Sequence, residues 1–118
     1  MENVIVLFEV AIKNGKMDDY LSSAGELKEY LKSIKGFVRA ERFSSLQNEG
    51  KLLSMTVWEN EESIREWRNL EAHRLSQKAG RDTDFVDYKI TVVTPLRTYT
   101  MNERKNAPID SNDYFQIN

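Results

Sequence analysis

Cysteine is absent from the 118-residue sequence, and histidine occurs once. The lack of thiols excludes disulfides, thiolate nucleophiles, cysteine-bound zinc and iron–sulfur clusters. A single histidine also excludes a multi-histidine metal site within one chain, although a symmetric dimer would present two copies. We therefore predict that the chain uses no metal, and its thiol-free composition is compatible with a reducing cytoplasm.

Net charge and long apolar runs are also lacking. Seventeen Lys and Arg residues against nineteen Asp and Glu residues leave a net charge of −2, so no broad positive field is available for a phosphate backbone. No apolar run approaches the ~20 residues of a membrane-spanning helix. The first residues, MENVIVLFEVAIKNG, resemble neither a basic leader nor an export signal. We therefore expect neither nucleic acid nor membrane as a partner, and a cytoplasmic location.

The sequence does contain a regular succession of strand and helix patterns. Apolar residues that alternate predict strands, and apolar residues three or four positions apart predict amphipathic helices. Asn60 is suited to begin the second helix, and Pro95 requires a bend or an edge position in the last strand. The expected strands cover 4–12, 37–46, 51–59 and 88–101, and the expected helices cover 16–35 and 61–80.

This order predicts an α+β fold, the ferredoxin-like βαββαβ subunit with an antiparallel sheet. Two helices cover one face of such a sheet, yet both rows of the first strand are apolar except around Glu9. A second copy of the same sheet is the least costly cover, so we predict a homodimer that forms a dimeric α+β barrel. The domain is expected to span residues 1–101, and residues 102–118 are expected to form an irregular C-terminal tail.

A family pattern runs from Glu41 to Tyr88, with ERF, GK, LS, W, then WR, H, Q, GR, F and Y at their spacings. Its strongest piece is WENEESIREWRNLEAHRLSQKAGR. Through these residues the chain, over about Val4 to Tyr99, resembles the antibiotic biosynthesis monooxygenase (ABM) domain family. The resemblance implies dimers of ferredoxin-like subunits with a pocket between each sheet and its helices. The family includes cofactor-independent monooxygenases of quinols or aromatic polyketides, haem-degrading enzymes, and members without assigned activity.

Trp67 and His73 are the candidate catalytic residues. On helical spacing alone, Trp67 is a core aromatic residue and His73 is a boundary histidine with a hydrogen-bonded neighbour. The resemblance implies instead that Trp67 lies on the pocket wall, where a flat apolar surface stacks against a planar substrate. His73 is the single histidine, so it is the near-neutral base available to deprotonate that substrate.

Other residues are candidates for binding the substrate. Arg74 and Arg81 could donate to a developing oxyanion, but complementation of the helix dipole is the favoured interpretation of their position. Glu41 and Arg42 alternate on a strand and could equally form a surface ion pair, so they are not counted among the predicted site residues. The predicted substrate-binding residues are Phe43, Arg74, Arg81, Phe85 and Tyr88.

The resulting prediction is a cofactor-independent monooxygenase that oxidises a small aromatic substrate, a quinol or an anthrone, with O2. One alternative is a non-catalytic dimeric protein that binds a small ligand or is associated with stress. Another is a haem-degrading monooxygenase, which is disfavoured because the interval from Trp67 to His73 is shorter than in those relatives and Val10 stands near the position of their first-strand asparagine. No Gly-rich, phosphate-cradling loop is present, so no cofactor is expected.

Overall fold

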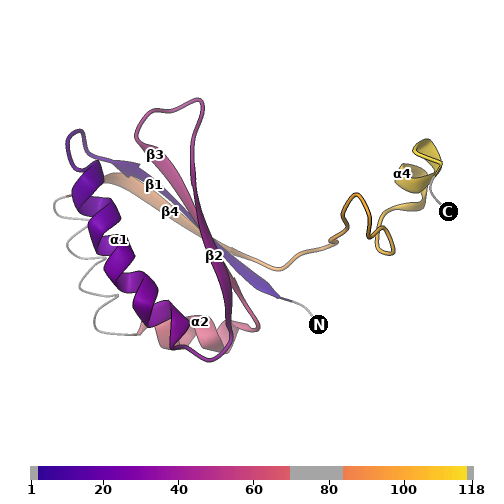
Figure 1. Cartoon of the computed structure of the whole chain (residues 1–118), viewed down its shortest axis with the longest axis horizontal. Helices are drawn as coiled ribbons and strands as arrows, with labels where there is room; N and C mark the ends of the chain where they lie inside the picture. The colour runs from indigo at the N-terminus through magenta and orange to yellow at the C-terminus, as the bar shows by residue number, and fades with distance from the viewer. Residues whose placement is uncertain (1–2, 70–83, 117–118) are drawn as a thin grey trace.

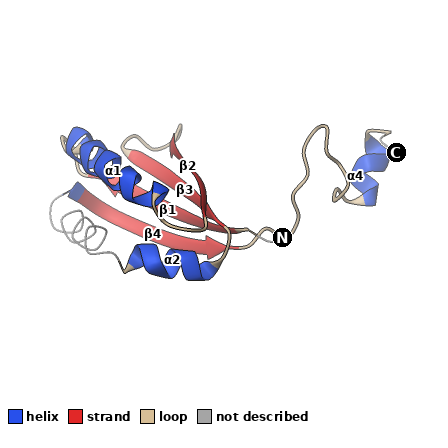
Figure 2. Cartoon of the chain, turned by 60° about the horizontal axis from the view of Figure 1, so that its bottom comes forward, coloured by secondary structure: helices blue, strands red, loops and turns tan. Residues whose placement is uncertain are grey.

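A computed structural model describes residues 3–69 and 84–116 of the chain. Within them, four strands form one antiparallel sheet in the order β2-β3-β1-β4. Helices α1 and α2 lie on the same face of this sheet (Figure 2). The predicted ferredoxin-like α+β fold is therefore confirmed. The elements are β1 (Val4–Ile12), α1 (Met17–Lys32), β2 (Phe37–Ser44), β3 (Lys51–Trp58), α2 (Glu61–Arg68), β4 (Phe85–Val93) and α4 (Ile109–Tyr114).

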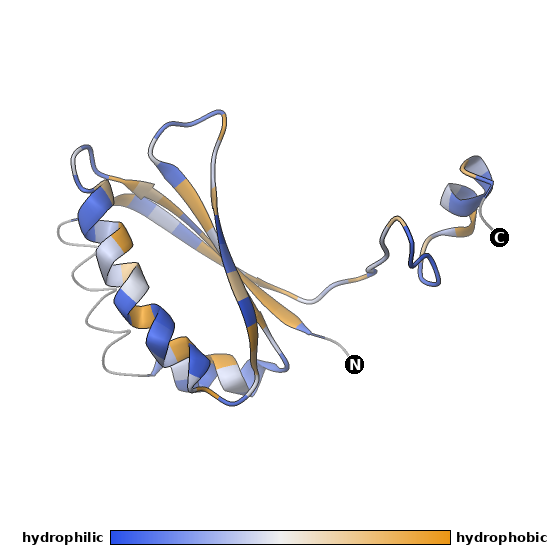
Figure 3. Cartoon of the chain, viewed as in Figure 1, coloured by the Kyte–Doolittle hydropathy of each residue, from blue (hydrophilic) through white to orange (hydrophobic). Residues whose placement is uncertain are grey.

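The core lies between the sheet and the helices, and it consists of two clusters. Successive side chains of a strand point to opposite faces, and the row of β1 that contains Val4 and Val10 faces α1 and α2. In Figure 3 the apolar residues of α1 are interrupted by hydrophilic ones, as an amphipathic helix requires. The first cluster contains Val4, Leu31, Ile34, Trp58 and Ile64, and the second contains Val10, Ile12, Tyr20, Leu52 and Phe85.

The start of α2 is fixed by a cap and by a close approach to the preceding turn. Asn60 accepts a hydrogen bond of 2.9 Å from the backbone N–H of Ser63, which confirms the predicted helix start. Gly36 has φ +95°, and a Cβ there would collide with the side chain of Ser63. Glycine is the residue that adopts this conformation without a steric cost. The turn after α1 and the beginning of α2 can therefore pack against each other.

The last strand differs from the prediction of 88–101. β4 begins at Phe85, which pairs with Ile12, and ends at Val93, which pairs with Ile5. β1 starts one residue before Ile5, so Val4 is the one position of β1 left beyond this pair. Pro95 follows, and its lack of an N–H is incompatible with continued pairing.

The segment after β4 extends away from the sheet, as Figure 1 shows. The prediction of an irregular tail is wrong for Ile109–Tyr114, which form the short helix α4. Arg104 orders this segment: its Nε donates to Asn112 Oδ1 at 2.9 Å, and one terminal nitrogen donates to Ser111 Oγ at 2.9 Å. Such side-chain bonds carry no periodic signal, which explains why the sequence pattern does not predict a helix here.

The second helix is expected from the sequence to continue to Gly80. The structure describes α2 as Glu61–Arg68, and residues 70–83 lie outside the described part of the chain. In the segments that are described, no helix combines the length and the apolar character needed to cross a membrane.

Candidate functional site

A cavity of about 200 Å³ lies on the helix-bearing side of the sheet. Val6 and Phe8 contribute the middle of the helix-facing row of β1, and Ala24 and Leu27 contribute the middle of α1. Members of both core clusters also border the cavity. It therefore separates the two clusters, where a continuous core would otherwise form.

The cavity exists because small side chains occupy the centre of this layer. On the helix-facing row of β3, Ser54 and Thr56 stand between the buried residues Leu52 and Trp58. Across from them α1 contributes Ser23, with Ala24, to the cavity wall. Close-packed interiors leave voids where side chains are too short to interdigitate. These residues are not among the site residues predicted from the sequence, although the alternation of large and small residues in LLSMTVW was the available signal.

Aromatic side chains form much of the wall. Trp67 lines the cavity and packs, partly buried, against the first core cluster. Phe85 lines it from the other cluster, with its ring centroid 5.5 Å from that of Tyr20. Trp58 is fully buried, and its Nε1 donates to Thr56 Oγ1 at 2.9 Å. Aromatic faces of this kind suit a flat apolar ligand.

Tyr20 and Arg42 bring polar groups to the same cavity. Burial raises the pKa of the Tyr20 phenol above its ordinary value of 10.0, while the nearby Arg42 opposes this shift. The Arg42 guanidinium carbon lies 5.9 Å from the centroid of the Tyr20 ring. The alternative of an ion pair between Glu41 and Arg42 does not apply, because Glu41 pairs with Arg39 at 3.8 Å on the other face of the sheet. Tyr20 is thus a neutral hydrogen-bond donor at neutral pH.

Tyr88 lies beside the cavity wall and is not among its described lining residues. Its ring centroid is 5.6 Å from Phe8 and 5.9 Å from Phe85. Phe85 and Tyr88 share the helix-facing side because the register of β1 and β4 shifts between Ala11 and Ile12. This bulge reverses the alternation of side chains, so two predicted binding residues at odd spacing come together.

Phe43 lies on the opposite face of the sheet from the cavity. The β2–β3 register shifts between Phe37 and Arg39. Because of this shift, Phe37 and Ala40 both face the helices and pack against the first core cluster, although they are three positions apart. Regular alternation resumes after Ala40, so Phe43 faces the other way. Phe43 is 40% exposed and borders a hollow of the open face together with Leu53. The structure thus separates Phe43 from Trp67 and Phe85.

Three of the predicted site residues, His73, Arg74 and Arg81, lie outside the described residues. Their roles remain predictions. Among the residues that are described, Asp84 is the acidic side chain that lines the cavity, and no group of three or more metal-binding side chains is found there.

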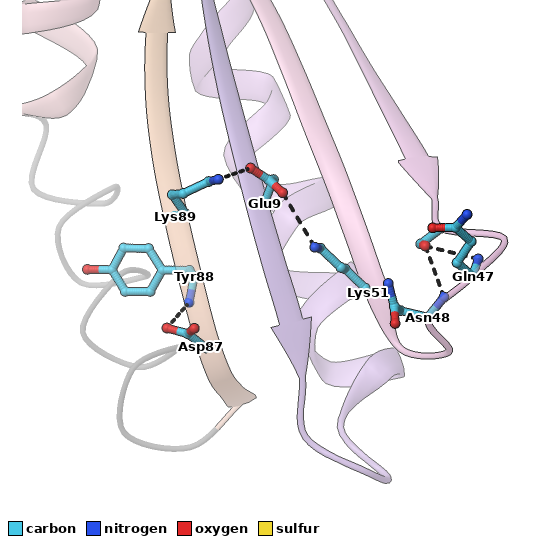
Figure 4. Close-up of polar contacts among 8 residues, drawn as sticks. Glu9, Gln47, Asn48, Lys51, Asp87, Tyr88 and Lys89 are labelled. Atoms are coloured by element: carbon cyan, nitrogen blue, oxygen red, sulfur yellow. Dashed lines mark hydrogen bonds and ion pairs between the residues drawn. The ribbon is translucent and has the colours of Figure 1, made fainter.

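The open face of the sheet carries an ion-pair ladder across three strands. Glu9 of β1 lies between Lys89 of β4, at 3.1 Å, and Lys51 of β3, at 3.4 Å (Figure 4). The hydrogen bond from Lys89 is the main cause that lowers the pKa of the Glu9 carboxyl below its ordinary value of 4.5. Next to this ladder the face is apolar, with Ile5, Leu7, Leu53, Met55 and Val57 in register on β1 and β3.

Comparison with solved structures shows how widely this fold occurs. SnoaB, a cofactor-independent oxygenase from Streptomyces nogalater, superposes with a TM-score of 0.73 at 14% sequence identity, covering 87% of this chain and 100% of that chain. A conserved protein from Methanosarcina mazei Go1 superposes with a TM-score of 0.72 at 15% identity, covering 79% of this chain and 92% of that chain. At these identities the likeness concerns the fold alone.

Sequence comparison identifies the family as well as the fold. The jasmonate monooxygenase ABM of Pyricularia oryzae is 34% identical over 102 residues, which cover 86% of this chain and 47% of the relative. The chain thus spans about half the length of that relative. The family model described as antibiotic biosynthesis monooxygenase matches residues 3–79. This match covers more than half of the chain, and the chain belongs to the antibiotic biosynthesis monooxygenase family.

Proposed function

We propose that the chain is a cofactor-independent monooxygenase that oxidises a small aromatic substrate, a quinol or an anthrone, with O2. The observation that carries the proposal is the cavity walled by Trp67, Phe85 and Tyr20 in a chain of this family. The fold relative SnoaB is a cofactor-independent oxygenase, which supports a mechanism without a cofactor.

The chemistry requires the substrate to supply the electrons. An anthrone loses a proton from its methylene carbon, and the resulting carbanion transfers an electron to O2. Recombination forms a carbon–oxygen bond, and the O–O bond then breaks with elimination of water. One oxygen atom remains on the former methylene carbon as the quinone carbonyl, and the other leaves as water with both methylene hydrogens. The protein must then supply a base, a donor for the oxyanion and a water-poor pocket.

The chain offers residues for each of these tasks. His73 is proposed as the base, and Trp67 and Phe85 as the stacking walls. Arg74, Arg81 and Tyr88 are proposed as further contacts to the substrate. The neutral phenol of Tyr20 is a donor placed at the cavity itself.

Oxygen uptake with an added anthrone tests the proposal. The purified protein should consume O2 without flavin and with a chelator present, and Trp67→Ala should lower kcat/KM by removing a stacking wall. His73→Ala should slow turnover by ~10²–10⁴, the usual loss for a general base. Tyr30→Ala, at an exposed position of α1, is the control. Turnover that requires flavin or metal and persists in His73→Ala would contradict the mechanism.

Jasmonate is a second candidate substrate, favoured because the Pyricularia oryzae relative is a jasmonate monooxygenase. Insertion of oxygen at a saturated carbon needs two electrons beyond those of the substrate, so this assay includes NADH and is repeated without it. Product formation from jasmonate, with no turnover of the anthrone, would replace the aromatic substrate in the proposal. Binding of both compounds without turnover of either would support the non-catalytic alternative.

The proposed working unit is a homodimer formed through the open face of the sheet. Apolar residues of β1 and β3 lie there without a covering element among the described residues, and the segment after β4 extends beyond its own sheet (Figure 1). Burial of two identical apolar faces is the usual basis of a two-fold dimer. Sedimentation should give twice the 13.8 kDa chain mass; a stable monomer at micromolar concentration would exclude this assembly.

A further inference from the structure

Two arginines from different elements border the cavity at its exposed margin. Arg42 comes from the edge strand β2, and Arg68 is the last residue of α2. Both residues are exposed as a whole, while most of the remaining wall consists of apolar side chains. The cavity therefore combines an apolar interior with positive charge at its mouth.

Neither guanidinium is neutralised by an ion pair within the described part of the chain. The neighbouring arginine of β2, Arg39, does have such a partner in Glu41. Arg42 instead lies over the ring of Tyr20, a contact that leaves its in-plane N–H donors able to bind an acceptor. Asp84 contributes one negative charge to the lining, so the two arginines leave the described wall with a positive balance.

We propose that this cavity binds an apolar cyclic compound that carries a carboxylate, with the ring inside and the carboxylate between Arg42 and Arg68. The proposal rests on the cavity being the substrate site argued above, and it specifies the substrate as an organic monoanion. Arginine matches the two oxygens of a carboxylate with parallel N–H donors. A quinol or an anthrone that carries a carboxylate meets this requirement, whereas a neutral one would leave both guanidiniums to water.

A matched pair of probes, 2-naphthoate and 2-naphthamide, separates charge from shape. Isothermal titration calorimetry should give the carboxylate at least about tenfold higher affinity than the amide, the scale of a charge-assisted hydrogen bond near a surface. Both tryptophans of the chain, Trp58 and Trp67, line the cavity. Their two indole N–H signals in an NMR titration should therefore shift with either probe, which locates the binding.

Variants on the same two elements provide matched controls. Arg42→Gln and Arg68→Gln should each weaken 2-naphthoate about five- to tenfold and leave 2-naphthamide unchanged. Arg39→Gln, on the opposite face of β2, and Arg65→Gln, one turn earlier on α2, should change neither affinity. Arg42→Lys should retain part of the preference for the carboxylate, which distinguishes lost charge from a disturbed Tyr20 contact.

The outcomes separate this inference from the proposed site. Equal affinity for acid and amide, with both indole signals shifting, would overturn the anion preference and leave the cavity as the binding site. The same loss of carboxylate affinity in Arg39→Gln would also overturn it, because general surface charge would then explain the effect. If neither probe binds or shifts an indole signal, the inference and the proposed site both fail.

Discussion

The two faces of the sheet use the same alternating strands for different purposes. On the helix side, the row of β3 is large at both ends and small in the middle, at Ser54 and Thr56, which leaves a cavity between two core clusters. On the open side, the rows stay apolar and are crossed by the ladder of Lys51, Glu9 and Lys89. One face thus has a cavity with its own helical cover, and the other has a continuous surface suited to a second sheet.

The largest effect is expected when an aspartate is introduced on each face of β1 in turn. Val10, on the helix side, is 1% exposed, so Val10→Asp buries an unpaired charge and should lower the free energy of unfolding by at least several kcal/mol. Leu7→Asp, on the open face, should leave the chain folded and convert the proposed dimer to a monomer. Circular dichroism in urea and sedimentation measure the two effects. Equal unfolding by both substitutions would contradict the distinction between the faces.

A smaller loss of stability is expected at the contact between the turn after α1 and the start of α2. Gly36→Ala forces a positive φ on alanine and brings its Cβ 2.8 Å from the Ser63 Cβ, an overlap that rotation of the hydroxyl cannot relieve. The free energy of unfolding should fall by about 2 kcal/mol. Gly25→Ala is the control, since its Cβ meets no atom within 4 Å; in the middle of α1 it should stabilise by about 0.5–1 kcal/mol. A neutral Gly36→Ala would mean that this contact does not hold α2 in place.

Filling the cavity should separate stability from binding. Ser54→Val adds apolar volume at the centre of the layer and should raise the free energy of unfolding by about 1 kcal/mol, the scale of one or two buried methylenes. The same substitution should weaken the 2-naphthoate probe because it occupies the ligand's space. Urea titration and calorimetry measure both quantities. Unchanged affinity in a stabilised variant would place the binding site elsewhere.

The sequence was sufficient to predict the order of strands and helices. It was insufficient to predict on which face of the sheet individual side chains lie. Both rows of β1 and the helical stripe of α1 are local periodicities, and they predict the βαββαβ order. The face of Phe43 depends on a bulge between Phe37 and Arg39, which reverses the alternation without leaving a mark in composition. Phe85 and Tyr88 meet for the same reason, through the shift in the β1–β4 register.

The cavity could be anticipated only in part. Small residues at Ser54 and Thr56 are visible in the sequence, but a void also requires small residues opposite them on α1, and that pairing is a tertiary relation. The acidic neighbour of Arg42 in the sequence left a surface ion pair open as an alternative to a role at the site, and the structure pairs that neighbour with Arg39 instead. The strand alternation that puts Arg42 and Ala40 on one row, away from Glu41, was the signal that could have excluded that alternative.

The smallest effects are expected in the pH dependence of stability, where the two faces should act at opposite ends of the scale. Lys89 lowers the pKa of Glu9 on the open face, so near this pKa the carboxyl group binds fewer protons in the folded state than in the unfolded state. Its stabilisation is present above the unfolded pKa and is lost as pH falls through the lower folded value. Glu9→Gln should therefore flatten the acid limb of a urea-midpoint profile below about pH 4.5.

Tyr20 on the cavity face should act at the alkaline end. Burial raises its pKa above 10.0, so its stabilisation is complete below the unfolded value and is lost as pH rises through the folded one. Tyr20→Phe should remove that alkaline loss, and Tyr30→Phe, at an exposed position of the same helix, should retain it. Urea midpoints measured from about pH 9 to 11 test this. If the two phenylalanine variants lose stability equally at alkaline pH, burial of the Tyr20 phenol against the cavity does not cause that loss. The contrast in pH dependence between the two faces would then depend on Glu9 at acidic pH alone.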